Sequence, residues 1–312
     1  MKVVRYYEYG DRTVLRYEDA ERPSPAAGQV LVQIAGSAFN PVDAAIRAGY
    51  LQGVFPVTFP HVPGFDISGT VAALGNGVTG FELGQAVVGF LPMHEDGTAA
   101  EYVLAPADAL VSAPTSIPLA EASALPSAGL TAWQALFDEA GLQSGQRILV
   151  NGAGGSVGGL AVQLAKQAGA HVIATASPRS DKAVRRNGAD EVIDHTSASV
   201  IDSVGRTIDV VLNLAPATPA EQAAIAGLVA AGGTFVTTVP PGPGEDVPAT
   251  VRVVNLFVRS DAAQLRQLVA QVDAGQLRVD VAETRALDEL GSVHARSDAG
   301  ELRGKVVVVP AR

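Results

Sequence analysis

The chain has 312 residues, of which 47% are hydrophobic and 17% charged, which is typical of a globular protein with two hydrophobic cores. Its formal net charge of −10 argues against nucleic-acid binding, because phosphate contacts need a concentrated basic surface and the 22 basic residues are scattered. The absence of cysteine excludes disulfides, thiolate zinc sites and a cysteine nucleophile.

The N-terminal segment MKVVRYYEYG is polar and strand-like, without the basic and apolar regions of a signal peptide. No stretch of the sequence approaches the roughly 20 apolar residues of a membrane span. We therefore expect a cytoplasmic protein with no membrane partner.

Up to about residue 120, short β-rich runs alternate with proline and glycine turns. These runs are residues 29–34, 66–73, 85–90 and 100–104. They predict an irregular, antiparallel, barrel-like domain over residues 1–122.

From Ser123 onward, strands alternate with helices, which is typical of a parallel sheet covered on both faces. Strands are expected at residues 147–151, 171–176, 191–194, 208–214, 234–239 and 251–258, and a helix is expected at 158–169. This pattern predicts an α/β, doubly wound nucleotide-binding domain over residues 123–260.

After Arg259 the pattern predicts a helix over 261–274, a strand near Val279, a helix over 287–294 and a final strand over 305–309. The parallel sheet is already complete, so residues 261–312 are expected to return to the first domain. We expect the active-site cleft to lie between the two domains.

A glycine-rich turn, Gly152-Ala153-Gly154-Gly155-Ser156-Val157-Gly158, connects the strand over 147–151 to the following helix. Glycine lets the backbone approach a pyrophosphate, and the helix N-terminus favours its negative charge. The strand, turn and helix together predict dinucleotide binding rather than a tight turn without a ligand.

The end of the second strand of this domain carries Ser177, Arg179 and Lys182 where an NAD-specific site usually has an acidic residue. Lysine is otherwise found only at Lys2, Lys166 and Lys305. The basic and hydroxyl groups could bind a 2′-phosphate, so NADPH is the expected cofactor, although Asp181 weakens this argument.

Five stretches are similar to the medium-chain dehydrogenase/reductase superfamily, in particular its zinc-independent, zeta-crystallin-like quinone oxidoreductase branch. They are residues 36–43, 63–69, 128–133, 152–166 and 187–194. The resemblance covers essentially the whole chain, and it implies a GroES-like β-rich catalytic domain followed by a Rossmann domain.

The resemblance also shows where zinc-dependent relatives would hold their metal. Their cysteine ligand falls at Asn40, and the histidine of their Gly-His-Glu segment falls at Phe65, because this chain reads Gly64-Phe65-Asp66. With no cysteine for a structural site, the resemblance implies no metal-binding residues.

Carried over by position, the resemblance places Asn40 and Tyr50 beside the substrate as catalytic candidates. It implies cofactor contacts from Thr131, Gly152, Gly154, Gly155, Ser156, Val157, Gly158, Lys182, His195, Leu214, Val239, Phe257 and Arg259. Residues 240–248 fit the family pattern poorly.

Without zinc, reduction of a quinone or an α,β-unsaturated carbonyl is favoured over oxidation of a simple alcohol. Asn40 and Tyr50 would stabilise the developing oxyanion, with water as the proton source. Each has a structural alternative: Asn40 as a turn residue bonded to local backbone, Tyr50 as a pocket wall, and nearby Asp43 as a helix cap.

Two other functions fit the same motifs: an NADPH-binding sensor or scaffold with little turnover, and a pathway-specific enoyl reductase. A homodimer is expected because the apolar strand over 251–258 would otherwise be an exposed sheet edge.

Overall fold

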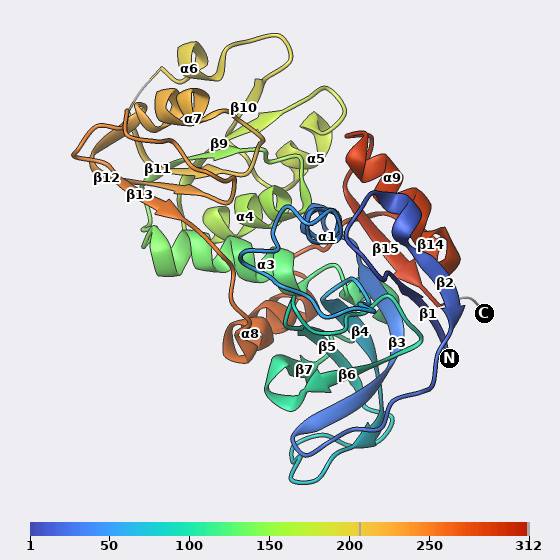
Figure 1. Ribbon diagram of the computed structural model, residues 1–312. Helices are drawn as coiled ribbons and strands as arrows, with labels where there is room; N and C mark the ends of the chain where they lie inside the picture. The colour runs from blue at the N-terminus through green and yellow to red at the C-terminus, as the bar shows by residue number, and fades with distance from the viewer. Residues whose placement is uncertain (206, 311–312) are drawn as a thin grey trace. The chain divides into compact units, whose positions relative to one another are not determined.

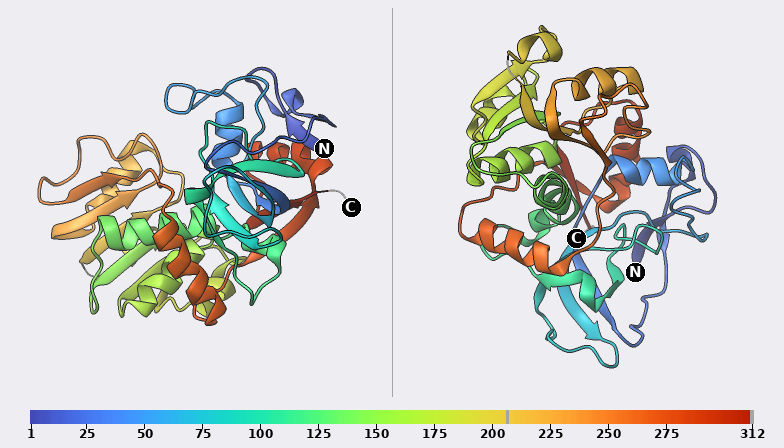
Figure 2. Two further views of the ribbon diagram at one scale, coloured as in Figure 1. Left: turned by 90° about the horizontal axis from the view of Figure 1, so that it is seen from below. Right: turned by 90° about the vertical axis from the view of Figure 1, so that its left-hand side faces the viewer.

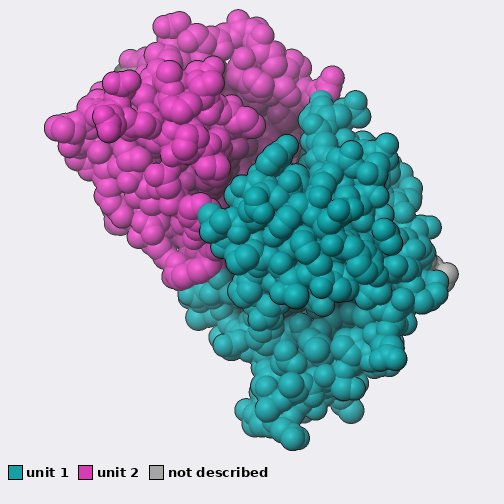
Figure 3. Space-filling view, in the orientation of Figure 1, with its two compact units in different colours: residues 1–127, 260–312 teal, residues 128–259 magenta. Residues whose placement is uncertain are grey.

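The computed structural model describes residues 1–205 and 207–310 and divides the chain into two units (Figure 3). Unit 1 combines Met1–Ser127 with Ser260–Arg312, and unit 2 is Ala128–Arg259. The boundaries between the units fall at 127/128 and 259/260, whereas the change in sequence pattern predicted them at 122/123 and 260/261. The first division lies inside a helix, which a change of composition does not reveal.

Unit 2 contains a six-stranded sheet in which every pair of neighbours is parallel (Figure 1). Its strands are β8 (Arg147–Asn151), β9 (His171–Ala176), β10 (Glu191–Asp194), β11 (Ile208–Asn213), β12 (Val229–Thr237) and β13 (Arg252–Asn255). In the order β10-β9-β8-β11-β12-β13, the chain adds strands outward from β8 on one side and then outward from β11 on the other, so the strand order reverses between β8 and β11. This confirms the predicted doubly wound α/β fold.

The helices of unit 2 pack on this sheet (Figures 1 and 2). They are α4 (Ser156–Gln167), α5 (Asp181–Arg186), α6 (Val200–Ser203) and α7 (Pro219–Ala226). Before them, α3 (Pro126–Trp133) continues into a π-helical segment, η3 (Gln134–Glu139). Contacts join α4 to β8 and β9, α5 to β9 and β10, and α7 to β11 and β12.

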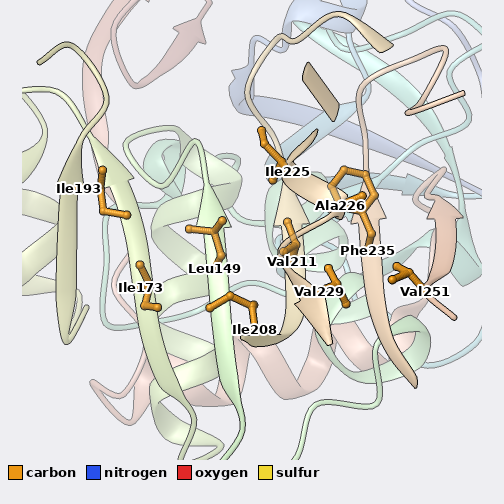
Figure 4. Close-up of a cluster of buried hydrophobic side chains, with 10 residues drawn as sticks. All are labelled: Leu149, Ile173, Ile193, Ile208, Val211, Ile225, Ala226, Val229, Phe235 and Val251. Atoms are coloured by element: carbon orange, nitrogen blue, oxygen red, sulfur yellow. The ribbon is translucent and has the colours of Figure 1, made fainter. Parts of the chain in front are cut away.

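The core of unit 2 is built from apolar residues of adjacent strands (Figure 4). Leu149, Val211 and Phe235 come from β8, β11 and β12 and are completely buried. Ile225 and Ala226 of α7 pack on them. Burying one such large side chain contributes about 1.5–3 kcal/mol, so this layer fixes the strands whose ends carry the site described below.

Unit 1 contains a seven-stranded sheet and a separate two-stranded sheet, β1 (Lys2–Arg5) with β2 (Arg16–Asp19). The larger sheet runs β14-β15-β3-β4-β5-β7, and β6 also pairs with β3. Its strands are β3 (Gln29–Ala38), β4 (Asp66–Leu74), β5 (Ala86–Phe90), β6 (Tyr102–Pro106), β7 (Leu110–Ser112), β14 (Val281–Ala286) and β15 (Lys305–Val309). Because β15 pairs antiparallel with β3, this part of the C-terminal segment belongs to the larger sheet of unit 1.

Unit 1 also contains α-helices and short 3-10 helices. They are α1 (Pro41–Arg47), α2 (Leu119–Ala122), α8 (Ala262–Asp273) and α9 (Leu290–Asp298), with η1 (Arg12–Val14), η2 (Ala107–Ala109) and η4 (Leu287–Glu289). No helix in the part of the chain that the structure describes is long and apolar enough to cross a membrane.

Candidate functional site

The glycine-rich turn follows β8, next to the point where the strand order of unit 2 reverses. In open parallel sheets the ligand binds outside the carboxyl ends of the strands at this reversal. The fold therefore puts the predicted dinucleotide-binding turn where a doubly wound sheet binds its nucleotide.

Steric limits explain the glycines of this turn. Gly152 has a φ of +92°, which side chains rarely adopt, and a Cβ on Gly158 would lie 2.4 Å from the Gly152 carbonyl oxygen. Gly155 is the N-cap of α4 and has no side chain to cap it. The amides of Ser156, Val157 and Gly158 therefore have no acceptor within the helix, and they form a donor set suited to a pyrophosphate.

The loop after β9 adjoins the glycine turn, and the loop after β10 adjoins the end of β9. A Cβ on Gly154 would lie 2.6 Å from Ser180 Oγ, which accepts a hydrogen bond from the Ser177 amide at 3.1 Å. His195 follows β10 and donates its amide hydrogen to the Ala176 carbonyl at 3.1 Å. Ser177 and His195 thus lie on neighbouring loops at the same edge of the sheet.

The charged side chains after β9 differ in whether they form ion pairs within the protein. Asp181 pairs with Arg185 one helical turn later at 3.0 Å. Arg179 and Lys182 are exposed, and neither makes a hydrogen bond or ion pair with any residue that the structure describes. The acidic side chain that weakened the NADPH prediction is therefore neutralised locally, while two cations remain available to a phosphate.

The other predicted cofactor residues also belong to unit 2. Leu214, Val239 and Phe257 follow the carboxyl ends of β11, β12 and β13, at the same edge of the sheet as the glycine turn. The Arg259 backbone binds Gln134 of η3, and its guanidinium pairs with Asp138 at 2.9 Å. Thr131 is buried on α3, directly before that segment. The cofactor roles of these residues remain predictions.

In unit 1, polar side chains gather around the buried carboxylate of Asp66, the first residue of β4. Asp66 accepts hydrogen bonds from the Ser127 amide at 2.7 Å, from Ser127 Oγ at 2.5 Å and from Asn40 Nδ2 at 2.9 Å. Lys305, only 4% exposed, places its Nζ 2.5 Å from Asn40 Oδ1 and 3.4 Å from Asp66 Oδ2. We call Asn40, Asp66, Ser127 and Lys305 the Asp66 cluster.

The Asn40 amide is fully engaged inside the Asp66 cluster. Its Nδ2 donates to Asp66 and to the Ala38 carbonyl at 3.2 Å, and its Oδ1 accepts from Lys305 and from Ser127 Oγ at 3.4 Å. The Ala38 contact is the local backbone bond expected of the structural alternative. Donating to a substrate oxygen would require Asn40 to give up one of these bonds, so its catalytic role remains a prediction.

Helix α1 begins at Pro41 with Asn40 as its N-cap, so Asp43 lies in the first turn and does not precede the helix as the predicted cap; its side chain instead closes a capping box with Asn40. Its Oδ2 accepts the Asn40 amide hydrogen at 2.8 Å. Burial removes the carboxylate from water and raises the pKa of Asp43 to about 7.

Phe65, at the position of the zinc-binding histidine in metal-dependent relatives, is buried with its ring centre 5.3 Å from that of Phe90.

Tyr50, the second catalytic candidate, lies in the turn after α1 with 84% of its surface exposed. Its amide donates to the Ala45 carbonyl at 3.0 Å. No contact in unit 1 joins its ring to the Asp66 cluster among the described residues. Its roles as oxyanion donor or pocket wall both remain predictions.

We expect Asp43→Asn to stabilise the protein more at pH 8 than at pH 5. The folded-state pKa of Asp43 is about 7, above the unfolded value of about 4. Protonated Asp43 therefore contributes its full stabilisation of the folded protein below about pH 4, and this stabilisation is lost as the pH rises to 7. Asparagine still accepts the Asn40 amide hydrogen but never ionises. Melting temperatures of both proteins at the two pH values measure the effect, of up to about 3 kcal/mol. An equal difference at both pH values would contradict it.

Sequence reasoning did not include Asp66, Ser127 or Lys305 among the site residues. Lys305 carried a signal, because lysine is rare in this chain and this one opens a strongly apolar run. Ser127 carried none, since nothing in the sequence around it indicates that its amide and hydroxyl both bind a distant carboxylate.

Comparison with known proteins matches both units. Residues 26–115 match the family described as alcohol dehydrogenase GroES-like domain, and residues 187–308 match the family described as zinc-binding dehydrogenase. The chain is 33% identical over 327 residues to the chloroplast envelope quinone oxidoreductase homolog of Arabidopsis thaliana, covering 99% of this chain and 98% of that protein.

Two further matches extend this result. The 2-methylene-furan-3-one reductase of Solanum lycopersicum is 31% identical over 323 residues, covering 99% of this chain and 79% of that protein. The solved structure of the quinone oxidoreductase from Coxiella burnetii superposes with a TM-score of 0.91 at 27% identity, covering 100% and 99% of the two chains. With the doubly wound sheet and its glycine turn, these matches show that the chain belongs to the medium-chain dehydrogenase/reductase superfamily, in its quinone oxidoreductase branch.

Proposed function

We propose that this protein is an NADPH-dependent reductase that transfers hydride to a quinone or an α,β-unsaturated carbonyl without zinc. The observation that carries the proposal is the glycine turn of unit 2, next to a loop in which Arg179 and Lys182 have no partner among the residues that the structure describes. The relation to quinone oxidoreductases over almost the whole chain supports the reaction class.

The charges of the loop after β9 support NADPH over NADH. An acidic residue at the end of β9 would bind the ribose hydroxyls of NADH, but β9 is followed by Ser177. Asp181 is paired with Arg185, so it does not offset the positive charge of Arg179 and Lys182. A 2′-phosphate would gain charge-assisted hydrogen bonds from these side chains.

We expect the double variant Arg179→Ala/Lys182→Ala to lose its preference for NADPH. The dissociation constant of NADPH should rise about 10- to 100-fold, because two charge-assisted contacts to the 2′-phosphate are removed, and that of NADH should stay within about twofold. Fluorescence titration with both nucleotides measures this. Asp181→Ala/Arg185→Ala is the matched control, since it removes the paired Asp181 and Arg185 together and leaves Arg179 and Lys182 in place. Equal weakening of both nucleotides would contradict the assignment.

The donor set of unit 1 does not fit a catalytic zinc ion. Phe65 has no metal-binding atom, and the Asn40 amide already binds Asp66 and Lys305. The Lys305 ammonium, 2.5 Å from Asn40 Oδ1, would also repel a cation placed there. This chemistry of the side chains supports zinc-independent reduction.

Reduction of a quinone or an α,β-unsaturated carbonyl does not require the protein to form a covalent bond to the substrate. A bound reduced nicotinamide would supply the hydride, and one proton from water would complete the hydroquinone or saturated ketone. The residues of the chain orient the acceptor and stabilise its developing oxyanion, with Asn40 and Tyr50 as the proposed donors. The buried Lys305 charge would polarise the Asn40 amide and strengthen its N–H groups as donors.

An enone is a second acceptor class with its own support, because one relative at 31% identity is a 2-methylene-furan-3-one reductase. A quinone and an enone share the conjugated carbonyl that accepts hydride. Comparing kcat/KM for 1,4-benzoquinone and a short enone ranks the two classes.

We also propose a homodimer formed through β13. In the described part of the sheet, β13 pairs only with β12, and its Val253 is 36% exposed. An unpaired strand edge is commonly covered by symmetric association. Sedimentation velocity at micromolar concentration should show a dimer, and a monomer would reject the proposal.

A further inference from the structure

A row of uncharged polar side chains crosses the sheet of unit 2 at the carboxyl ends of four adjacent strands. Thr175, Asn151, Asn213 and Thr237 come from β9, β8, β11 and β12, and Gln222 of α7 joins them. Asn213 lies opposite both Asn151 and Thr237 in the strand register. All five are buried, with at most 6% of their surface exposed. We call them the polar row.

Hydrogen bonds connect the polar row without a break. Thr175 Oγ1 donates to Asn151 Oδ1 at 2.9 Å, and Asn151 Nδ2 donates to Asn213 Oδ1 at 2.7 Å. Asn213 Nδ2 donates to Thr237 Oγ1 at 3.2 Å and to Gln222 Oε1 at 3.4 Å, and Thr237 Oγ1 donates to Gln222 Oε1 at 2.9 Å. In the described part of the chain, none of these side chains has a buried polar atom without a partner.

The side chains at both ends of the polar row form hydrogen bonds with backbone groups of the adjoining loops. At one end, Thr175 Oγ1 accepts the amide hydrogen of Gly152, the first residue of the glycine turn, at 2.8 Å. At the other end, Thr237 Oγ1 accepts the Val239 amide hydrogen at 3.1 Å, and Gln222 Nε2 donates to the Val239 carbonyl at 3.2 Å and the Ala217 carbonyl at 3.3 Å. The row therefore ties together the loops that follow β8, β11 and β12.

Packing alone does not explain these residues. The interiors of the same strands are apolar, as at Leu149, Val211 and Phe235, and apolar groups of similar shape would stabilise the sheet about as well as a hydrogen-bonded row. A fully satisfied polar network instead restricts the geometry of its members. In a doubly wound sheet the two halves of a dinucleotide bind on either side of the reversal in strand order, and the bond from Asn151 to Asn213 crosses that reversal.

We infer that the polar row consists of positioning residues, which fix the glycine turn relative to the loops after β11 and β12 so that both halves of the cofactor are held at once. The inference rests on the proposed binding of a nicotinamide dinucleotide. A ligand that fills only the adenosine half does not need the glycine turn aligned with the loops after β11 and β12. The whole dinucleotide needs this alignment.

Thr237→Val tests the inference, because it removes the hydroxyl at the far end of the row with little change of volume. Isothermal titration gives the dissociation constants of NADPH and of adenosine 2′,5′-bisphosphate, which carries only the adenosine half. We expect NADPH to bind about tenfold more weakly, as for loss of roughly one hydrogen bond that aligns the loops, and adenosine 2′,5′-bisphosphate to stay within about twofold. Thr237→Ser, which keeps the hydroxyl, should restore the wild-type ratio.

Thr234→Val is the matched control, since Thr234 is a buried threonine of the same strand outside the polar row. It should leave both constants within about twofold of wild type. If Thr237→Val does not fold, Gln222→Met takes its place, because it removes the bond from Thr237 Oγ1 to Gln222 Oε1 and the bond from Gln222 Nε2 to the Val239 carbonyl.

A lower melting temperature with an unchanged ratio of the two constants would show a merely structural row and overturn the inference, as would equal weakening of both ligands. Wild-type protein that binds neither NADPH nor NADH would overturn the proposed function and the inference with it. If wild type selects NADH, the same comparison is made with NADH and ADP, and the expected ratio is the same.

Discussion

Gly155→Val is expected to abolish NADPH binding and to leave the fold intact. Gly155 has φ −85° and ψ 173°, which any residue adopts, and a Cβ there would lie 3.5 Å from its nearest protein atom. The side chain would instead fill the space that a pyrophosphate needs to reach the amides of Ser156 and Val157. We expect a loss of affinity of about 100-fold or more, measured by titration, with a melting temperature within about 3 °C of wild type.

Gly53→Val is the control for this prediction, because Gly53 lies in unit 1 with no atom near its missing side chain. It should affect neither binding nor stability. Gly158→Ala should differ from both, since its Cβ would clash with the Gly152 carbonyl and lower stability as well. Normal NADPH affinity in Gly155→Val would mean that the turn does not hold a pyrophosphate.

Lys305→Met is expected to produce the largest loss of stability among the site variants. It removes the ammonium 3.4 Å from the completely buried Asp66 carboxylate and 2.5 Å from Asn40 Oδ1. Breaking a buried ion pair from one side leaves an uncompensated charge and costs about 3–5 kcal/mol. Urea unfolding of wild type and variant measures the free-energy difference.

Two further variants isolate the charge effect. Lys305→Met/Asp66→Asn should be more stable than Lys305→Met alone, because no charge is then left unpaired. Lys166→Met is the matched control, since Lys166 pairs with Asp190 at 2.8 Å with about a third of each side chain exposed, and its loss should cost about 1 kcal/mol or less. Equal costs for the two lysine variants would refute the account of the Asp66 cluster.

The Rossmann part of the fold could be predicted closely because its signals are local. The strands RILVN, HVIATA and EVID each contain a short apolar run that begins directly after a polar residue. The glycine turn follows the first of them directly. Neighbouring parallel strands end at one edge, so the loops after β9 and β10 could also be expected to meet.

The Asp66 cluster could not be predicted, because its members are far apart in the sequence. Asn40 and Asp66 are 26 positions apart, and Asp66 and Lys305 are 239 positions apart. They meet because β3 pairs with both β4 and β15, and this pairing and its register are set by packing rather than by any local pattern. The π-helical segment η3 could not be predicted for a different reason, because a single π-helical turn leaves no distinct pattern in the sequence.

The most direct test of the proposed function is to titrate the purified protein with NADPH and NADH and then follow the nicotinamide absorbance as acceptors are added. The acceptors are 9,10-phenanthrenequinone, 1,4-benzoquinone and a short enone. Selective consumption of NADPH with at least one acceptor is the predicted result. Tight binding of NADPH without turnover would favour a sensor or scaffold instead, and binding of neither nucleotide would contradict the central claim.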